Sequence, residues 1–454
     1  MNDLPNYFLA DLPADASLSA SLITEACQTL KRNRTKYLAD RPTSALIRAL
    51  HRTGENWLDE EYPLRRFTLE RGPEATGFSR ATIAAGLDAF FRQLNGESLE
   101  ALLTQELGHP QRLDTMVGSM TETRSQRMAM ANGPEFLVHV AAGNIPNPAM
   151  TSMVLGLLTR SAQFVKCARG TSFLPRLFAH SIYDSEPKLG ACLELAEWRG
   201  GTASLENALF AEADCVTATG SDEAILAIKE KLPVRTRFVS HGHRVSFGYV
   251  TRDALSAYNA KKNALRAAAD VAAWNQHGCL SPHLFYAEDG GDVTPEIFAE
   301  MLADALDKRE QAEPRGSIST EAAAGIASRR AFYEVRAAHS PGTKHWCSLD
   351  STAWTVVYES EPLFALSCLN RFVYVKKVQN LDEALRAADA MHGKVSTVGV
   401  AGTLHQTQEL AVQLARWGVT RVCPLGQMQN PPLSWRHDGR TALADLVTWT
   451  DWEQ

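Results

Sequence analysis

The sequence lacks the features that mark several large classes of protein. No stretch of its 454 residues approaches the ~20 consecutive apolar residues that a bilayer-spanning helix needs. Its formal net charge of -6 is the opposite of the basic surface that nucleic-acid binding requires. The first residues, Met1 to Pro5, have neither the basic nor the apolar region of a secretory signal. These absences favour a cytoplasmic protein with no membrane span and no nucleic-acid partner.

Cysteines are few and scattered. The eight cysteines include no Cys-x-x-Cys pair and no cluster, so a disulfide framework is not expected. A metal-binding set of His277, Cys279 and His283 lacks the usual ligand spacing. We therefore predict reduced thiols, most of them small core residues, and no metal centre.

The composition is that of an ordinary globular protein. Apolar residues make up 45% and charged residues 22%, and the length suffices for two or three domains. In the first part of the chain apolar residues recur at i, i+3 and i+4, which predicts helices at residues 18–37, 43–57 and 80–107.

From residue 136 onward, short β-prone runs alternate with helical segments. Strands are predicted at residues 136–140, 163–167, 214–218, 284–288, 353–358, 372–378, 397–401 and 420–423. Helices are predicted at residues 149–158, 174–182, 222–231, 253–276, 295–308, 381–391 and 406–417. Residues 311–319, rich in charge, proline and glycine, are typical of a surface connection. The alternation predicts an α/β fold with two parallel-sheet domains and a helical N-terminal portion.

One strand-to-helix turn, Thr219-Gly220-Ser221, has the form of a phosphate-binding turn. Gly220 permits close backbone approach, and Ser221 is placed to cap a helix whose N-terminus attracts anions. Lys166 lies at the end of an earlier strand and Arg169 follows it, where two cations either contact a ribose phosphate or stay solvated. The sequence has no Gly-x-Gly-x-x-Gly fingerprint, so a standard dinucleotide fold is not supported. By themselves these residues fit ordinary loops equally well.

Cys279 differs from the other cysteines in its surroundings, Asn275-Gln276-His277-Gly278-Cys279-Leu280-Ser281-Pro282. A helix is predicted to end at the glycine, which leaves the thiol in a turn among polar groups, where it is deprotonated more easily than in a core. A thiolate both attacks and leaves well in acyl transfer. His277 and His283 flank it and are candidates for proton transfer, although histidines near turns are more often structural.

In order and approximate spacing, these motifs resemble the aldehyde dehydrogenase superfamily. The likeness rests on Gly143-Asn144-Ile145-Pro146, Val165-Lys166, Thr219-Gly220-Ser221 and the Cys279 segment. Further stretches are similar to one branch, the acyl-CoA reductases typified by LuxC, the reductase subunit of bacterial bioluminescence fatty-acid reductase. They are Gly242-His243-Arg244-Val245-Ser246-Phe247, Leu369-Asn370-Arg371-Phe372, Gly418-Val419-Thr420-Arg421-Val422, Pro424-Leu425-Gly426 and His437-Asp438-Gly439-Arg440. The resemblance covers roughly residues 124–452.

The resemblance implies roles for individual residues. Cys279 falls on the nucleophile, and Asn144 on the amide that forms an oxyanion hole with the Cys279 backbone N–H. Lys166 falls on a lysine that contacts the adenosine ribose, and Gly220-Ser221 on the turn beside the cofactor pyrophosphate. Arg169 falls where relatives that prefer NAD often carry a glutamate, so the resemblance favours NADPH over NADH.

Two acidic positions bear on the reaction. Glu361 lies near the superfamily's glutamate for the nicotinamide ribose, although Glu359 is an alternative. The glutamate that activates water in hydrolytic relatives has no counterpart in Val239-Ser240-His241-Gly242-His243-Arg244. Without that base the acyl group should exchange with thiols, which favours reduction of a thioester over oxidation of an aldehyde.

The resulting hypothesis is an NADPH-dependent reductase that converts an acyl-CoA or acyl-protein thioester, fatty acyl by resemblance, to an aldehyde. NADH is the alternative cofactor. The alternative functions are an NAD(P)-dependent aldehyde dehydrogenase and a catalytically decayed acyl-binding subunit. By resemblance we also expect a homo-oligomer and an acyl-activating partner subunit.

The predicted domains follow the same resemblance. Residues 1–130 form a helical portion that packs on the cofactor domain, and residues 131–252 bind the nicotinamide cofactor. Residues 253–425 carry the nucleophile, and residues 426–454 return to the cofactor or interface region.

Overall fold

The chain forms two compact α/β units, and the computed structural model describes residues 4–13 and 16–453. No secretory signal was expected at Met1 to Pro5, and residues 1–3 of that segment lie outside the described residues. The first unit comprises Met1–Arg71, Leu87–Gly242 and Pro432–Gln454, and the second comprises Gly72–Gly86 and His243–Pro431.

The first unit contains a five-stranded parallel sheet in the order β4-β3-β2-β5-β6. Its strands are β2 (Phe136–Val140), β3 (Ala162–Cys167), β4 (Leu193–Glu197), β5 (Cys215–Thr219) and β6 (Arg237–His241). The chain runs from β2 outward to β3 and β4, then returns to β5 and continues outward to β6. The topological switch point therefore lies between β2 and β5, where ligands of such sheets bind beyond the carboxyl ends of the strands.

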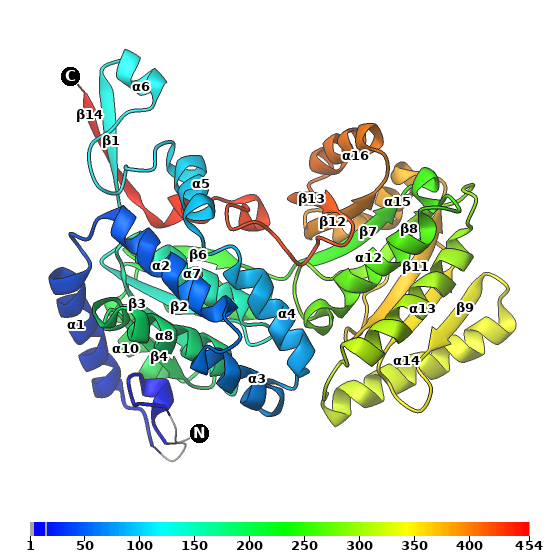
Figure 1. Cartoon of the computed structure of the whole chain (residues 1–454), viewed down its shortest axis with the longest axis horizontal. Coiled ribbons are helices and arrows are strands. Elements are labelled where there is room, and N and C mark those ends of the chain that lie inside the picture. Colours follow the sequence, from blue (N-terminus) through cyan, green and yellow to red (C-terminus); the bar gives the residue numbers. More distant parts are fainter. Residues whose placement is uncertain (1–3, 14–15, 454) are drawn as a thin grey trace. The chain divides into compact units, whose positions relative to one another are not determined.

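Helices cover this sheet (Figure 1). On one face α1 (Ala20–Tyr37) and α10 (Ala203–Glu212) share an apolar cluster with Phe136 and Phe164. Right-handed crossovers that reverse direction at the switch point place α7 and α8 on the opposite face from α10 and α11. The remaining helical elements up to this sheet's last strand are η1 (Leu9–Asp11), α2 (Thr43–Leu58), α3 (Pro63–Thr76), α4 (Arg80–Phe91), α5 (Gly96–Leu107), α6 (Met120–Arg124), α7 (Asn147–Leu158), α8 (Phe173–Ser185), α9 (Pro187–Gly190) and α11 (Asp222–Lys229).

The second unit contains a seven-stranded sheet in the order β13-β12-β7-β8-β11-β10-β9. All neighbours are parallel except β9 and β10. The strands are β7 (Val245–Val250), β8 (Pro282–Glu288), β9 (Thr343–Cys347), β10 (Thr355–Glu359), β11 (Phe372–Val378), β12 (Val395–Ala401) and β13 (Arg421–Pro424). The helical elements are η2 (Arg252–Leu255), α12 (Ala260–Ala272), η3 (Ala273–Gln276), α13 (Pro295–Ala312), α14 (Thr320–His339), α15 (Leu381–Ala387), η4 (Asp389–Met391) and α16 (Leu404–Arg416).

This sheet is buried on both faces, which explains its nearly continuous apolar strands. Along β11, Val373 and Val375 pack with α12 and α13 on one face. Phe372 and Tyr374 alternate with them and pack with α14, α15 and α16 on the other.

A small antiparallel sheet pairs β1 (Arg127–Asn132) with β14 (Thr448–Glu453), as Figure 1 shows beside the C-terminus. The tail before β14 contains η5 (His437–Gly439) and η6 (Ala444–Leu446). Within residues 4–13 and 16–453, no helix combines the length and the apolar character needed to span a membrane.

The predicted fold class is confirmed, whereas several predicted elements differ. The helix predicted at 80–107 is two helices, because Asn95 caps the second through its contact with the Ser98 N–H, 2.9 Å away. The helix predicted at 253–276 is divided into η2, α12 and η3. In the predicted surface connection 311–319, Arg315 is buried and hydrogen-bonds the Thr352 side chain at 3.1 Å.

The compact units also differ from the predicted domain ranges. β7 belongs to the second sheet, although residues 131–252 were expected to form the cofactor domain. Residues 72–86 of the N-terminal helical portion belong to the second unit rather than the first. The division falls between Gly242 and His243.

Candidate active site

The first unit gathers its candidate residues at the carboxyl edge of its sheet. Asn144 follows β2, Lys166 and Arg169 end or follow β3, and Gly220-Ser221 follow β5. Asn144 and Gly220 therefore flank the switch point between β2 and β5. Cys279 and Glu361 belong to the second unit, so their action together with Asn144 stays a prediction.

Gly143 is required by the close approach of two loops at this edge. A Cβ added to Gly143 would lie 2.8 Å from Thr171 Cγ2 and 3.2 Å from Ala168 Cβ. Only glycine lets the loop after β2 pack this tightly against the loop after β3. The exposed Asn144 side chain is thereby carried on a loop that contacts the one carrying Arg169.

Lys166 is a buried cation. Its side chain is 6% exposed, and its ammonium lies 5.9 Å from the centre of the Trp198 ring. Burial lowers the pKa of Lys166 from its usual range. Among residues 4–13 and 16–453 no carboxylate lies within salt-bridge distance of it, so a hydroxyl-rich or anionic ligand would improve its environment.

Arg169 is exposed, and a glutamate that was not predicted organises its loop. Glu197, the last residue of β4, accepts a hydrogen bond from the Gly170 N–H and another from Ser172 Oγ at 2.6 Å. The carboxylate is thus committed to the loop, and Arg169 extends toward solvent. An acidic residue at the end of a strand beside a lysine-bearing strand was the available sequence signal.

The turn after β5 has the predicted cap. Ser221 Oγ accepts a hydrogen bond from the Ala224 N–H at 3.3 Å, and the Gly220 N–H donates to the His241 carbonyl at 3.1 Å. Asp222 and Glu223 in the first turn of α11 already complement the helix dipole. Any phosphate here would rely on backbone N–H groups more than on the dipole.

In the second unit, an unusual backbone run precedes Cys279. Trp274, Asn275 and Gln276 adopt φ values of +48°, +52° and +64°. Non-glycine residues rarely adopt this region, and such runs persist only where the surroundings impose them. The run lies within η3, directly after α12, and turns the chain to His277-Gly278-Cys279 just before β8 begins.

A second run of residues with positive φ is hydrogen-bonded to the first. Leu369, Asn370 and Arg371 adopt φ values of +62°, +55° and +65°. The Asn370 N–H donates to the Asn275 carbonyl at 3.0 Å, and Arg371 Nε donates to Asn275 Oδ1 at 3.1 Å.

Further buried polar groups hold these two runs in place. Arg371 is fully buried and pairs with Glu310 at 2.7 Å. Gln276 Nε2 donates to the carbonyls of Pro282 and Phe372 at 2.9 and 3.0 Å. These contacts tie the turn before Cys279 to the core of the second unit from two sides.

Residues 72–86 pack beneath the same turn. The Phe78 ring lies 5.1 Å from the Trp274 ring. A Cβ on Gly86 would clash with Cζ2 of the Trp274 ring, so glycine is needed for the indole to pack there. His277 Nε2 contacts Asn370 Oδ1 at 3.0 Å, which gives this predicted proton-transfer candidate a structural partner.

The cysteines fall into two groups. Burial raises the pKa of Cys27, Cys167, Cys192 and Cys215 to about 12, so these buried thiols stay protonated as the core residues we predicted. Cys279 is only half-buried, and Ser246 Oγ donates to its carbonyl at 2.7 Å. All eight cysteines are thiols.

The second flanking histidine has a defined state. His283 Nδ1 accepts a hydrogen bond from the Ser367 N–H at 3.1 Å. Burial lowers the pKa of His283 to about 4, so the ring is neutral at physiological pH. It is therefore a poor base, and its proton is on Nε2.

The two alternative glutamates differ in environment. Glu359 is buried and pairs with Lys376, and it lies 3.2 Å from Arg336 Nη2. Glu361 keeps 56% of its side chain exposed and pairs with Arg336 at 3.0 Å. Glu361 is thus the more available carboxylate for a ligand hydroxyl.

One polar cluster escaped the sequence reasoning, although both of its segments were noted. His241 at the end of β6 stacks on His437, with ring centres 4.0 Å apart and an interplanar angle of 8°. Asp438, in a left-handed conformation, places Oδ2 3.3 Å from His241 Nδ1. Asp438 thus gives His241 a carboxylate partner from the C-terminal tail.

Comparisons with known proteins agree with this architecture. The family model described as acyl-CoA reductase (LuxC) matches residues 38–449. The chain is 25% identical to the long-chain acyl-protein thioester reductase of Aliivibrio fischeri, over 100% of this chain and 91% of that protein.

Solved structures show the fold. An NAD-dependent benzaldehyde dehydrogenase from Corynebacterium glutamicum matches with a TM-score of 0.68 and 15% identity, over 98% of this chain and 94% of that one. A bifunctional proline utilization A protein matches with a TM-score of 0.70 and 16% identity over 98% of this chain, which spans only 45% of that longer protein. The predicted aldehyde-dehydrogenase-like fold is confirmed.

Proposed function

Because the chain belongs to the acyl-CoA reductase (LuxC) family, we propose that it reduces an acyl thioester to an aldehyde through an acyl-Cys279 intermediate. The relative from Aliivibrio fischeri is named a long-chain acyl-protein thioester reductase, which supports a long acyl chain carried on a protein, and the family description supports CoA as the other carrier. NADPH is the proposed hydride donor.

The observation that carries this proposal is the rigid turn before Cys279. A nucleophile must be held where its attack geometry is fixed, because misplacement by about 1 Å can cost 10²-fold in rate. Two interlocked left-handed runs and the buried Arg371 supply that fixation for a half-buried thiol.

The proposed reaction has two parts, acylation of Cys279 and reduction of the acyl group. The Cys279 thiolate attacks the thioester carbonyl, a new C–S bond forms, and the carrier thiolate leaves and takes up a proton. A hydride then adds to the carbonyl carbon of acyl-Cys279, and the oxygen takes a proton to give a thiohemiacetal. The thiohemiacetal hydroxyl then loses its proton as the C–S bond breaks, which releases the aldehyde and regenerates the Cys279 thiolate. Asn144 and the Cys279 N–H would stabilise the oxyanion in both additions.

The residues of the first unit fit a nicotinamide dinucleotide. Bound beyond the switch point, the cofactor would supply the hydride that the protein cannot. The buried Lys166 would donate to ribose hydroxyls, the Gly220-Ser221 turn would hold the pyrophosphate, and Arg169 would contact a 2′-phosphate. Glu361, the more exposed of the two glutamates, would accept from the nicotinamide ribose.

A second candidate function has one observation in its favour. The His241–Asp438 pair is a carboxylate–histidine couple of the kind that activates water. An aldehyde dehydrogenase that hydrolyses acyl-Cys279 to a free acid would use such a base.

The deciding experiment is product analysis. Purified protein is incubated with a panel of acyl thioesters of increasing chain length, with NADPH or NADH, and products are identified by mass spectrometry. The proposal expects aldehyde that depends on both thioester and reduced cofactor. Free acid formed from aldehyde and oxidised cofactor would favour the second function. Acyl binding without any turnover would indicate a decayed subunit.

A further inference from the structure

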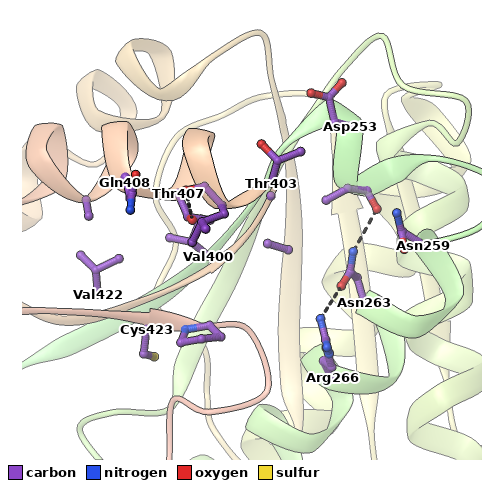
Figure 2. A pocket seen from close by; sticks show the side chains of 16 residues that line it. Asp253, Asn259, Asn263, Arg266, Val400, Thr403, Thr407, Gln408, Val422 and Cys423 are labelled. Atoms are coloured by element: carbon purple, nitrogen blue, oxygen red, sulfur yellow. Dashed lines mark hydrogen bonds between the residues drawn. The ribbon is translucent and has the colours of Figure 1, made fainter.

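The sheet of the second unit has a switch point of its own, and a cavity lies there. The crossover after β7 leads through α12 to β8, whereas the crossover after β12 leads through α16 to β13 on the other side. β7 and β12 are neighbours, so their carboxyl ends border the crevice where doubly wound sheets bind ligands. A cavity of about 640 Å³ opens at this point, lined by residues that follow both strands (Figure 2).

This cavity lies on the opposite sheet edge from Cys279. Cys279 precedes the amino end of β8, whereas Asp253 and Thr403 follow the carboxyl ends of β7 and β12. These strands are parallel to β8, so the length of a strand, roughly 20 Å for six residues, separates the two edges. The cavity is therefore distinct from the proposed reaction site.

One end of the cavity carries a cation that is held in place. Arg266 Nη1 contacts Asn263 Oδ1 at 3.4 Å, and Asn263 Nδ2 donates to the Ala254 carbonyl at 3.0 Å. Asn263 is 5% exposed, so this support is part of the core. Arg266 forms no ion pair with any residue of the described chain, which leaves its charge for a ligand.

The other end offers acceptors. Figure 2 shows Asp253 and Arg266 at opposite ends of this side of the cavity, with Asn259 between them. Asp253 accepts a hydrogen bond from Gln406 Nε2 and keeps a second carboxylate oxygen. Asn259 lines the cavity, and across residues 4–13 and 16–453 its side-chain amide has no hydrogen-bond partner.

The remaining walls combine small apolar side chains with the polar Thr403, Thr407 and Gln408. Val400, Leu404, Val422 and Pro424 contribute to them. At about 640 Å³ the cavity lies within the 300–1,000 Å³ of small-molecule sites and exceeds what a bare anion needs. A ligand that fits therefore has an anionic end, a hydroxyl-bearing middle and a flat, weakly polar part.

We propose that this cavity binds a nucleoside monophosphate. Its phosphate pairs with the Arg266 guanidinium, a geometry in which charge-assisted hydrogen bonds are strong. The ribose hydroxyls donate to Asp253 and pair with Asn259, and the base lies against the apolar wall formed by Val400 and Leu404.

The test is calorimetric titration of the whole protein with AMP while NADP⁺ is saturating, so that the nucleotide site proposed in the first unit is occupied. One AMP should bind per chain, and Arg266→Gln should weaken binding at least tenfold. Arg416→Gln, which removes an exposed arginine at the far end of α16, is the matched control and should leave binding unchanged. Thermal unfolding of both variants checks that each is folded.

Two further arms test the assignment of groups. Asp253→Asn should weaken AMP but not inorganic phosphate, and adenosine and phosphate should each bind far more weakly than AMP. Phosphate that binds as tightly as AMP would overturn the nucleotide assignment. Absence of AMP binding, or equal affinity of Arg266→Gln and Arg416→Gln, would overturn the site. None of these outcomes depends on aldehyde formation.

Discussion

The two sheets share a doubly wound topology, yet their candidate reaction groups lie at opposite edges. In the first unit, Asn144 and Gly220 lie on loops at the carboxyl edge, beside the switch point. In the second, Cys279 precedes β8 at the amino edge, and the carboxyl edge carries a separate cavity. The proposed cofactor side thus uses the usual ligand crevice of such sheets, and the nucleophile side does not.

Cofactor binding and nucleophilic attack place different demands on the backbone. Loops at a carboxyl edge provide N–H groups and small residues such as Gly143 at little conformational cost. A thiol at the amino edge has no such ready-made setting, and here it follows three consecutive left-handed residues. Those residues are held by a buried Arg371 and its partners, so rigidity is built from tertiary contacts.

The largest effect that sharpens this comparison is expected from Cys279→Ser. Aldehyde formation should be abolished, because an alcohol is a far weaker nucleophile than a thiolate. Folding and cofactor binding should remain. Intact mass after thioester treatment without cofactor should show one acyl adduct in the wild type and none in the variant.

Cys347→Ser is the matched control, since Cys347 is also half-buried in the second unit. It should keep both adduct and activity. An adduct that persists in Cys279→Ser would assign the nucleophile to another thiol.

On the first unit, Asn144→Ala should slow the reaction by about 10²–10³, as loss of one oxyanion donor does. Acylation and hydride transfer should slow together, because both pass through a tetrahedral oxyanion. Rapid-mixing measurements of adduct formation and of cofactor oxidation test each step separately.

Asn147→Ala, three residues along the same chain at the start of α7, is the control and should leave both rates nearly unchanged. A loss below about threefold for Asn144→Ala would remove Asn144 from the oxyanion hole.

Much of the sheet architecture was readable from local patterns. β2 and β11 have the predicted limits, because short apolar runs bounded by turn residues identify buried strands. β4, β6 and β7 were missed, because Glu194, Arg237 and Ser246 interrupt the apolar pattern of their strands. Their assignment depends on neighbours that are remote in sequence.

Those features of the candidate site that depend only on neighbouring residues in the sequence could be predicted. Ser221 as a cap follows from a serine before a helix, and it is confirmed. The hydrogen bond between Asn370 and Asn275 was not predictable, because it joins segments nearly a hundred residues apart. It also depends on left-handed backbone conformations that no sequence pattern encodes. The same holds for Asp438 beside His241 and for Glu197 beneath the Arg169 loop.

A smaller expected effect is a loss of stability at low pH, which arises from one buried histidine in each sheet. Burial lowers the pKa of His139 in β2 and of His283 in β8 from 6.5 to about 4. As pH falls through 6.5 the unfolded chain binds a proton that the folded chain refuses, so stability is lost between pH 6.5 and about 4. At pH 5 the loss is roughly 2 kcal/mol per histidine.

Hydrogen exchange of β2 and β8 peptides at pH 7 and pH 5 measures the two units separately. His139→Gln should flatten the pH dependence of β2 peptides only, and His283→Gln that of β8 peptides only. Each variant is the other's control. Equal flattening in both sheets would mean that the units open together and that the comparison between them fails.

The smallest effect concerns cofactor choice at the carboxyl edge of the first sheet. Arg169 is exposed, so its contribution to a 2′-phosphate should be about 1.5 kcal/mol, the low end for hydrogen bonds to charged groups. Arg169→Glu should reverse a preference for NADPH, because a carboxylate repels the phosphate and accepts from ribose hydroxyls. Values of kcat/KM for NADPH and NADH at low and moderate salt test this.

Arg235→Glu, at the opposite edge before β6, makes the same charge change and should leave the cofactor ratio unaltered. A wild-type preference for NADH, or equal weakening of both cofactors by Arg169→Glu, would mean that Arg169 is only a solvated surface charge and that Lys166 alone contacts the ribose.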